Sequence, residues 1–500
     1  MVYIANTLIL VPLLLKSLGK ERFAILALVT PFLRYGFTGV FDPGVAAGVT
    51  RFTSRSFANS ETEAVNSYIS SSIAVYLAIG IVLLAVYYFL GPLLMPHVIR
   101  TNAELFNEAK ITFTLALWIY ILFSISNPFF ALLIGIRRVE VTHWIGTSSL
   151  LLELGGILLL LPGKLTLTGV MWVYGANAII GLVLSVFLAR HFFPHLQVNS
   201  RLVSGRRTRE ILGYGGKFSG TTMATILSPV LDKLILARYT GLPEVAFYEA
   251  GSRFVDLLRR ATQLLLLPLF PMAAAHEGTH TERERHDFYA GVFSANILIS
   301  SGLYLVPAAL AFGIFRAWLG PGSRAGAIAF LVLCATVFCQ ALVGPISMIF
   351  GGTGRLKPLM ITAMISLLAN VTISPLLAHY FGFKGVLLGT FLGYGVVSLG
   401  FLAWTSSVPE FHVSLKRLAR VSILPILAAF LPGTVLMRAL HVEQQSFGPR
   451  GMCFVGITAF AVFLASSLIQ PEHRFMILKA FHLAGARIGE NCLKRKLSDA

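Results

Sequence analysis

The chain is poor in charge for its length. Only 12% of its 500 residues are Asp, Glu, Lys or Arg, whereas a soluble domain carries roughly 25%. Hydrophobic residues make up 56%, and the mean hydropathy is +0.77. This composition excludes an ordinary soluble globular protein. It predicts an all-α polytopic membrane protein instead.

Cysteine is also scarce, and the cysteines present show no metal-ligand spacing. Cys334, Cys339 and Cys453 fall within apolar runs, where a thiol behaves as a small core residue. The histidines of the stretch 276–286 lie in a loop rich in Glu and Arg, which we interpret as solvated. We therefore expect no metal and no cofactor.

Motifs for ATP hydrolysis, secretion and glycosylation are missing or misplaced. The stretch 213–217 lacks the first Gly of a phosphate-binding loop and is followed by Phe218, so no ATPase is predicted. No small-residue cleavage site follows the apolar residues 2–15, so we expect no cleavable signal peptide. Asn370-Val-Thr372 matches a glycosylation acceptor but lies inside an apolar run, and we interpret it as irrelevant.

Long apolar runs fill most of the chain. A bilayer is crossed by about 20 apolar residues, and this length rule predicts about 14 transmembrane helices. The predicted spans are 2–16, 24–47, 68–91, 113–136, 144–161, 167–189, 213–237, 244–274, 289–313, 326–350, 358–380, 383–406, 419–438 and 451–470.

Basic residues set the predicted orientation. An even number of spans places both termini on one side, and the segments on that side carry more Lys and Arg. The net charge of +18 therefore fits topology and anionic lipid headgroups better than nucleic acid. Both termini are predicted to be cytoplasmic, and the tail is expected to lie on the inner membrane surface.

A basic linker divides the spans into two halves. Short glycine turns at 18–23 and 240–245 suggest that the halves are repeats, an arrangement that places transporter substrate sites at the repeat interface. The expected organisation is an N-terminal six-helix bundle (1–190), a basic cytoplasmic linker (191–212), a C-terminal six-helix bundle (213–408), two extra transmembrane helices (409–470) and a basic cytoplasmic tail (471–500).

Two consecutive predicted helices carry stripes of polar residues, which are unfavourable on a surface that faces lipid. A charge at the bilayer centre costs about 2.5–3.5 kcal/mol or more, so it usually faces a bundle interior or a water-filled cavity. Residues three and four apart lie on one helix face, so each stripe lines one face of its helix. The stripes therefore predict a wet, charged cavity. They are Lys217, Thr221, Thr225, Ser228 and Asp232, then Glu249, Arg253, Asp256, Arg260 and Gln263.

Short motifs recur in both halves: Leu18-Gly-Lys-Glu-Arg-Phe-Ala24, Phe41-Asp-Pro-Gly44, Arg51-Phe-Thr-Ser-Arg55, Asp232-Lys-Leu-Ile-Leu-Ala-Arg238, Gly241 and Ala246-Phe-Tyr-Glu-Ala250. Together they resemble motifs of the polysaccharide or O-antigen flippases of the multidrug/oligosaccharidyl-lipid/polysaccharide exporter superfamily. The order and spacing of the spans match over nearly the whole chain. Ala24 stands where that family often has Gly, and Phe247 stands where Gly commonly precedes the Tyr, which leaves the subfamily open.

The resemblance implies two six-helix bundles plus two C-terminal helices, with a V-shaped central cavity. It also implies a flippase that moves polyprenyl-diphosphate-linked oligosaccharide from the cytoplasmic to the outer leaflet of a bacterial inner membrane, by alternating access, during cell-surface polysaccharide biosynthesis. The alternative is a cation-coupled multidrug efflux pump of the same superfamily. An enzyme is not expected, because lipid-sugar ligases and polymerases usually carry a large extracytoplasmic loop and the longest outward segment here, 91–112, is short.

Cations in and near the spans suit the diphosphate of such a substrate, because Arg binds phosphate oxygens bidentately. Alternatively, Arg253, Asp256 and Arg260 pair with one another along one helix face and hold helices together. The substrate-binding candidates are Arg34, Arg51, Lys217, Arg253, Asp256, Arg259, Arg260 and Gln263.

Asp42, Glu153 and Asp232 are the candidates for ion coupling, because buried carboxylates have tunable protonation. Asp42 alternatively caps a helix break beside Pro43, and Asp232 alternatively forms an interfacial helix-end pair with Lys233. The expected partners are a lipid-linked oligosaccharide, anionic membrane lipids, H⁺ or Na⁺, and other polysaccharide-assembly membrane proteins.

Overall fold

The structure is a computed structural model, and it confirms the predicted all-α membrane fold. Helices and short connections account for the described residues, and no strand occurs among them. Seven helices in this part of the chain are long and apolar enough to cross a bilayer, and two shorter apolar helices occur at Ser422–Val435 and Val455–Ala465. The structure describes residues 2–33, 42, 44–163, 165–266, 269, 282–352, 355–406, 415–439 and 449–468.

The chain divides into two compact units that do not follow sequence order. Unit 1 comprises Met1–Arg253 and Ala363–Thr390, and unit 2 comprises Phe254–Thr362 and Phe391–Ala500. The chain therefore passes from one unit to the other inside or at the end of two long helices, α8 and α15. The domain boundaries expected from the sequence stay a prediction.

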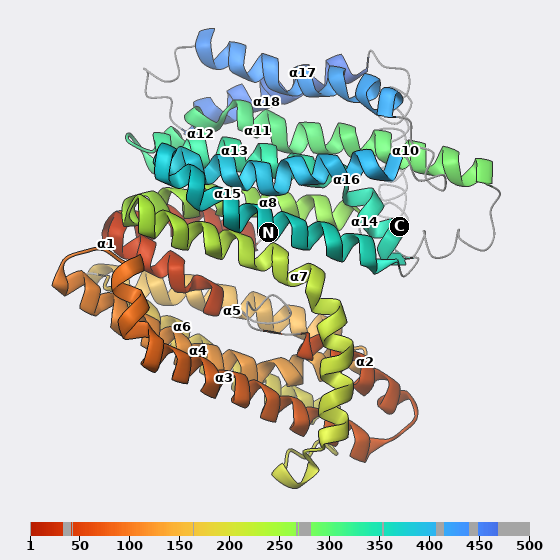
Figure 1. The fold of residues 1–500 in the computed structure, drawn as a ribbon. Coiled ribbons are helices and arrows are strands. Elements are labelled where there is room, and N and C mark those ends of the chain that lie inside the picture. The colour runs from red at the N-terminus through yellow and green to blue at the C-terminus, as the bar shows by residue number, and fades with distance from the viewer. Residues whose placement is uncertain are drawn as a thin grey trace, which may run out of the picture. The chain divides into compact units, whose positions relative to one another are not determined.

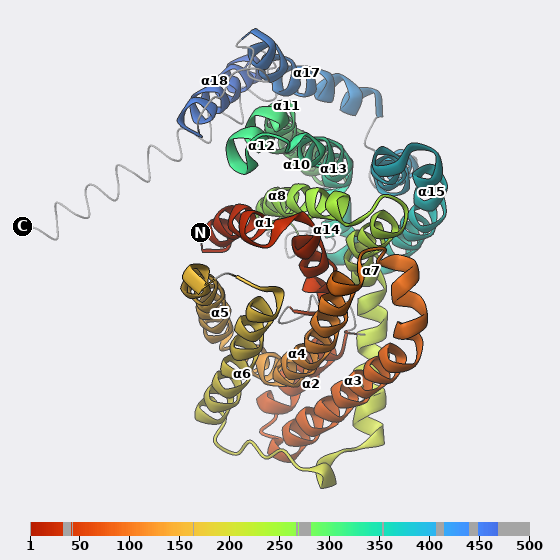
Figure 2. The ribbon, with the colours of Figure 1, turned by 90° about the vertical axis from the view of Figure 1, so that its left-hand side faces the viewer.

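Unit 1 is built around α4. The most apolar stretch of α4 is 72% buried, whereas that of α3 is only 11% buried, so α4 is central and α3 is free to face lipid. α4 lies against α2, α3 and α6, and α5 lies beside α6 (Figures 1 and 2). The elements are α1 (Val2–Val29), η1 (Thr30–Phe32), α2 (Val45–Ala58), α3 (Thr62–Val98), α4 (Ala103–Gly135), α5 (Val139–Leu160), η2 (Leu161–Gly163), α6 (Leu167–Phe192), η3 (Ser200–Leu202), α7 (Gly205–Tyr239) and the unit 1 parts of α8 (Leu242–Leu266) and α15 (Leu356–Thr390).

The prediction of one continuous helix over 24–47 is wrong. α1 ends at Val29, and α2 begins only at Val45. Gly44 precedes α2 with a φ of 78°, a left-handed conformation that glycine adopts at little cost. The stretch 24–47 is apolar apart from a few residues such as Arg34 and Asp42, so its hydropathy gives no sign of the break. The expected break between the first two spans lies inside α1, where Gly19 takes a φ of 80°.

α7 begins at Gly205, earlier than the predicted span at 213. The connection from α6 to α7 is held against α3 by hydrogen bonds, which form a strap between them. Polar residues in the first turns of α3 bind backbone groups of the connection, which explains a serine-rich stretch in an otherwise apolar helix. The bonds are Asn66 Nδ2 to His195 O at 2.9 Å, Gln197 N to Asn66 Oδ1 at 3.1 Å, Ser67 Oγ to Leu202 O at 2.9 Å, Asn199 N to Ser70 Oγ at 3.2 Å and Ser204 N to Ser71 Oγ at 3.0 Å.

Glu210, in the first turns of α7, closes this strap. It accepts a hydrogen bond from the Tyr68 hydroxyl at 2.5 Å and pairs with Arg206 and Arg207 at 3.2 and 3.3 Å. The bond from Tyr68, aided by the two arginines, lowers the pKa of Glu210. The carboxylate therefore stays ionised and keeps α7 attached to α3 at neutral pH.

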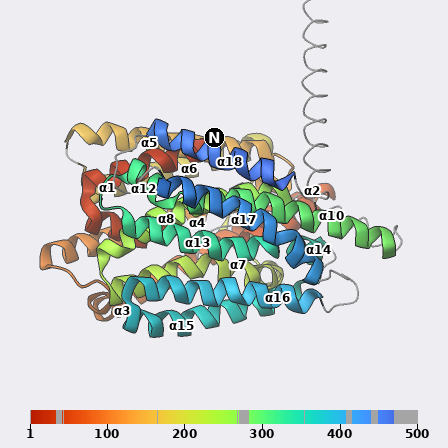
Figure 3. The ribbon, with the colours of Figure 1, turned by 90° about the horizontal axis from the view of Figure 1, so that it is seen from above.

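Unit 2 has shorter and more interrupted helices. Two π-helical turns, η4 and η5, interrupt its helices, and an aromatic cluster of Phe254, Phe315 and Phe330 lies in its core. α17 packs against α18, and α13 packs against α12 and η5 (Figure 3). Its elements are α10 (Glu282–Ser300), η4 (Ser301–Leu305), α11 (Val306–Ala309), α12 (Ala311–Leu319), α13 (Arg324–Leu342), α14 (Gly344–Gly352), η5 (Phe391–Val396), α16 (Val397–Ser406), α17 (Leu415–Ala439) and α18 (Pro449–Ser467), with the unit 2 parts of α8 and α15.

The crossing of α2 and α7 predicts a sharp effect of one methyl group. A Cβ at Gly48 would lie 2.8 Å from the carbonyl oxygen of Ile211, and a backbone atom cannot move aside cheaply. We expect Gly48→Ala to lower the free energy of unfolding by about 1–3 kcal/mol, measured by denaturation in detergent. Gly146→Ala in α5, where no atom lies within 4 Å, is the control and should lose nothing. Equal stability of the two variants would contradict this packing.

Candidate functional site

A buried ion-pair network joins α7 to α8 inside unit 1. Glu249 accepts hydrogen bonds from Lys233 Nζ at 3.0 Å and from Arg253 Nε at 2.6 Å, one on each carboxylate oxygen. Lys233 also donates to the backbone oxygen of Ala27 at 2.8 Å, which brings α1 into the network. The three charged side chains are at most 10% exposed. This network therefore holds three helices together through charge.

In this network two cations contact one carboxylate, and Lys233 also interacts electrostatically with the neighbouring Asp232. Moving charges out of water is costly, and a buried pair recovers that cost only where geometry and hydrogen bonding are good. Here both oxygens of Glu249 are engaged at short distances. The Arg253 guanidinium is thus committed to Glu249 in this conformation, a different pairing from that with Asp256 considered from the sequence.

A second buried cluster is rich in oxygen and surrounds Asp232. Its carboxylate is fully buried and accepts hydrogen bonds from Tyr248 Oη at 2.7 Å, Thr390 Oγ1 at 2.8 Å and Asn370 Nδ2 at 3.1 Å. Ser374 Oγ lies 3.1 Å from Asn370 Nδ2. Asp232 and Lys233 are both buried inside the protein, and their interpretation as an interfacial helix-end pair stays a prediction.

Two features of this cluster are typical of an ion site rather than of a closed structural network. The Oδ1 atom of Asn370 is buried without a hydrogen-bond partner in the described part of the chain, so one oxygen acceptor is unused. A π-helical turn, Phe391–Val396, follows directly after Thr390, and such turns are frequent at functional sites.

The cluster offers oxygen ligands only and carries a single formal negative charge. The oxygen atoms that could bind a cation belong to the Asp232 carboxylate, the Asn370 amide, the hydroxyls of Ser374 and Thr390, and the backbone of Val386. The Val386 oxygen already accepts a hydrogen bond from Thr390 at 3.0 Å. Hard cations favour such ligands. The arrangement can hold Na⁺, or a proton on Asp232.

The other ion-coupling candidates lie elsewhere in unit 1. Asp42 is buried, accepts from the backbone N of Val45 at 2.7 Å and from Tyr76 Oη at 3.0 Å, and thereby supports the start of α2. Glu153 in α5 accepts from Tyr174 Oη in α6 at 2.6 Å. Each of these carboxylates has a local hydrogen-bonding role, and neither belongs to the Asp232 cluster.

The substrate-binding candidates fall in both units: Arg51 and Arg253 belong to unit 1, whereas Asp256, Arg259, Arg260 and Gln263 belong to the unit 2 part of α8. Arg51 on α2 is exposed, and its guanidinium lies 4.3 Å from the ring centre of Tyr214. Arg259 pairs with Asp256 at 3.8 Å, and Arg260 and Gln263 are exposed farther along α8. Arg34 and the side chain of Lys217 lie outside the residues that the structure describes.

Sequence reasoning missed most partners of Asp232. Tyr248 lies within a quoted motif but was given no role, while Thr390 carried no local signal. Asn370 was dismissed with a misplaced glycosylation motif. The available signal was a polar residue, Asn370, inside an apolar span, because polar residues within membrane spans usually have a function.

A family match agrees with this architecture. The model of a family described as polysaccharide biosynthesis protein matches residues 1–276, more than half of the chain. The chain belongs to this family. The resemblance inferred from the sequence motifs is therefore confirmed.

Solved structures of other proteins share the fold of this chain. A structure described as lipid II flippase MurJ, inward closed conformation, has a TM-score of 0.73 and 13% identity, over 95% of this chain and 98% of that chain. An inward-facing multidrug resistance MATE family transporter of the MOP superfamily has a TM-score of 0.65 and 15% identity, over 84% of this chain and 94% of that chain. The predicted fold is thus confirmed. The search among curated proteins gives no match.

The ion-pair network predicts that Glu249 is essential for the stability of the protein. Glu249→Gln removes the carboxylate that Lys233 and Arg253 both contact, and breaking a buried pair typically costs about 3–5 kcal/mol. Denaturation in detergent should show a loss of that size.

Glu210→Gln is the matched control for this prediction, because Glu210 also contacts two cations but is partly exposed. Exposed pairs contribute about 0–1 kcal/mol. Similar losses in the two variants would show that burial does not strengthen the Glu249 network.

Proposed function

We propose that this protein is a flippase that moves polyprenyl-diphosphate-linked oligosaccharide from the cytoplasmic to the outer leaflet of a bacterial inner membrane. It works by alternating access during cell-surface polysaccharide biosynthesis, and it is not an enzyme. The family match over residues 1–276 carries this proposal. The fold shared with a protein described as a lipid II flippase, over 95% of the chain, supports it.

Arg51 is the first proposed contact for the diphosphate. It lies on α2 near the end of unit 1 that carries the basic α6–α7 connection, which is the predicted cytoplasmic end. Stacking on Tyr214 orients its guanidinium while leaving it exposed, and a planar guanidinium binds phosphate oxygens bidentately. Lys217, Arg259, Arg260 and Gln263 are further proposed substrate contacts.

Ion coupling is proposed at Asp232. A monovalent cation bound between Asp232, Asn370 and Thr390 would neutralise the carboxylate and replace several of its hydrogen bonds, so occupied and empty states favour different arrangements of α7 and α15. In transporters, broken helices commonly supply the Na⁺ or H⁺ site. The downhill ion would then drive the uphill step.

The test of transport compares two arginines on one helix. Arg51 and Arg55 are both exposed on α2, one turn apart, but Arg51 is held on Tyr214. In proteoliposomes with a fluorescent polyprenyl-diphosphate sugar, we expect Arg51→Gln to slow flipping at least tenfold and Arg55→Gln to leave it within twofold. Absence of flipping by the unaltered protein under both Na⁺ and pH gradients would refute the flippase.

Coupling is tested by replacing the carboxylate with its neutral isostere. Asp232→Asn keeps the shape of the side chain but removes the charge that a cation needs. We expect an imposed Na⁺ or pH gradient to stop stimulating transport, while the exposed Glu140→Gln variant keeps its stimulation. Full gradient stimulation in Asp232→Asn would place the coupling site elsewhere.

A multidrug efflux pump is the second candidate, because the fold also matches a multidrug transporter with a TM-score of 0.65. Efflux would predict that the protein restores drug resistance to an efflux-deficient host. Resistance without flipping of lipid-linked sugar would favour this second function.

A further inference from the structure

A pocket lies at the end of unit 1 opposite to the basic connection. α7 runs 35 residues from that connection to this end, about 50 Å at the rise of an α-helix. The break in α1, the loop between α3 and α4, and the start of α8 meet there around a cavity of about 440 Å³. This volume falls within the range of small-molecule sites. Its position makes it the outward end in the predicted topology.

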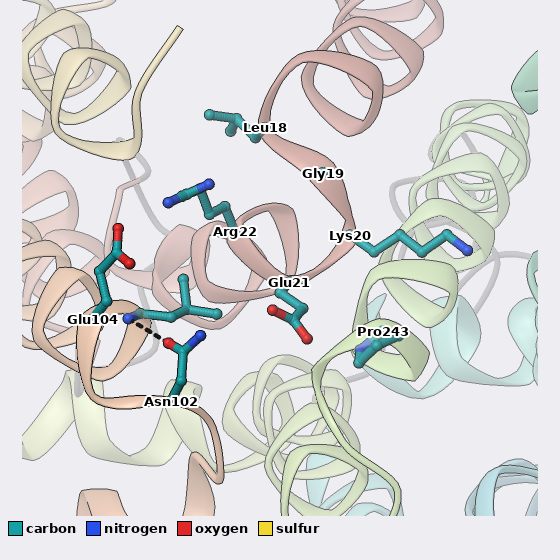
Figure 4. Close-up of a pocket in the computed structure, with 9 residues that line it drawn as sticks. Leu18, Gly19, Lys20, Glu21, Arg22, Asn102, Glu104 and Pro243 are labelled. Atoms are coloured by element: carbon teal, nitrogen blue, oxygen red, sulfur yellow. Dashed lines mark hydrogen bonds between the residues drawn. The ribbon is translucent and has the colours of Figure 1, made fainter.

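The α1 break presents charged residues to the pocket. Gly19, with a φ of 80°, interrupts α1, and Lys20, Glu21 and Arg22 follow it at once. Figure 4 shows the Glu21 side chain between Asn102 and Pro243, with Lys20 on the Pro243 side and Arg22 on the other. One sharp turn therefore directs both signs of charge into one small volume.

Some of these groups are fixed, and others remain available. Arg22 is locked to Glu108 by two bonds of 2.7 Å, and Lys20 lies 5.0 Å from the ring centre of Phe247. Glu21 and Glu104 are exposed and make no hydrogen bond or ion pair within the described residues. The pocket thus has rigid walls and two acceptor carboxylates open to a ligand.

The Asn102 amide adds a donor. Its Oδ1 accepts from the backbone N of Leu105 at 2.9 Å, at the start of α4 (Figure 4). This bond holds the side chain in place and leaves the Nδ2 hydrogens for a ligand. Donors and acceptors therefore alternate around the pocket.

The charge pattern selects the ligand class. Arg22 is already paired with Glu108, so the open charged groups are Lys20, Glu21 and Glu104, and the two carboxylates disfavour an anion. A hydroxyl group donates to carboxylates and accepts from N–H groups, so a neutral polyol meets both kinds of group favourably. Leu18, Leu105 and Pro243 supply an apolar wall on the same cavity, which suits the C–H face of a sugar ring.

We propose that this pocket binds a neutral sugar unit at the outward end of unit 1. The inference rests on the proposed function, because a flippase that delivers a lipid-linked oligosaccharide exposes the glycan at that end. The pocket receives one part of the glycan after the diphosphate has left Arg51, and it opposes return of the headgroup.

The test uses the full-length protein in nanodiscs and saturation-transfer NMR. The probes are glucose, galactose, rhamnose, N-acetylglucosamine and chitobiose, with phosphoethanolamine and inorganic phosphate as zwitterionic and anionic probes. We expect at least one neutral saccharide to bind. The double variant Glu21→Ala/Glu104→Ala should weaken its binding at least tenfold, since two charge-assisted hydrogen bonds are lost. Glu63→Ala, an exposed residue at the start of α3, is the control and should bind as the unaltered protein does.

A second variant fills the pocket without removing Arg22 or Glu108. Glu104→Trp should abolish saccharide binding while the melting temperature stays unchanged, because Glu104 is exposed. Binding of phosphoethanolamine in place of saccharides, binding of no saccharide, or saccharide binding that both variants retain would each overturn the proposal.

Transport separates this inference from the proposed function. An unaltered protein that flips lipid-linked sugar but binds no saccharide overturns the pocket alone. A protein that binds saccharide in an Glu21- and Glu104-dependent way but flips nothing supports the pocket and overturns the flippase.

Discussion

The sharing of Glu249 between Lys233 and Arg253 is the constraint on which unit 1 depends. Inside a membrane protein each of these charges is costly alone, so α7 and α8 must keep the register that brings them together. That register places Asp232, next to Lys233, against Tyr248, next to Glu249. The ion-pair network therefore positions the oxygen cluster, and a structural interaction prepares the candidate coupling site.

Much of this arrangement follows from local pattern. Low charge and long apolar runs predict the membrane class. Polar residues at helical spacing predict a wet, charged cavity lined by Asp232, Glu249 and Arg253; the structure shows these three side chains buried, and the wet cavity stays a prediction. Identifying their partners requires tertiary structure. Asn370 and Thr390 lie 138 and 158 positions beyond Asp232, and no periodicity within a helix pairs residues so far apart.

The sequence predicts the helices of this protein better than it predicts the breaks within them. The apolar run over 24–47 satisfies the length rule for a span, yet Gly44 in a left-handed conformation and the capping contact from Asp42 to Val45 restart the helix. Hydropathy averages over such residues and cannot register a change in backbone direction. The same limit applies to Gly19, whose break creates the sugar pocket proposed above: the sequence predicts a turn there, but not which side chains converge.

The two polar clusters lie where the chain leaves unit 1. Arg253 is the last residue of unit 1 on α8, and Thr390 is its last residue on α15. Each of these residues hydrogen-bonds within a cluster, Arg253 to Glu249 and Thr390 to Asp232. A cation that displaces the Thr390 hydroxyl from Asp232 would act on the residue directly before the π-helical turn Phe391–Val396. This turn opens the second chain segment of unit 2. Thr390 is both a ligand of the proposed ion site and the residue at which the chain passes from unit 1 to unit 2. It therefore links the proposed ion binding to the proposed alternating access.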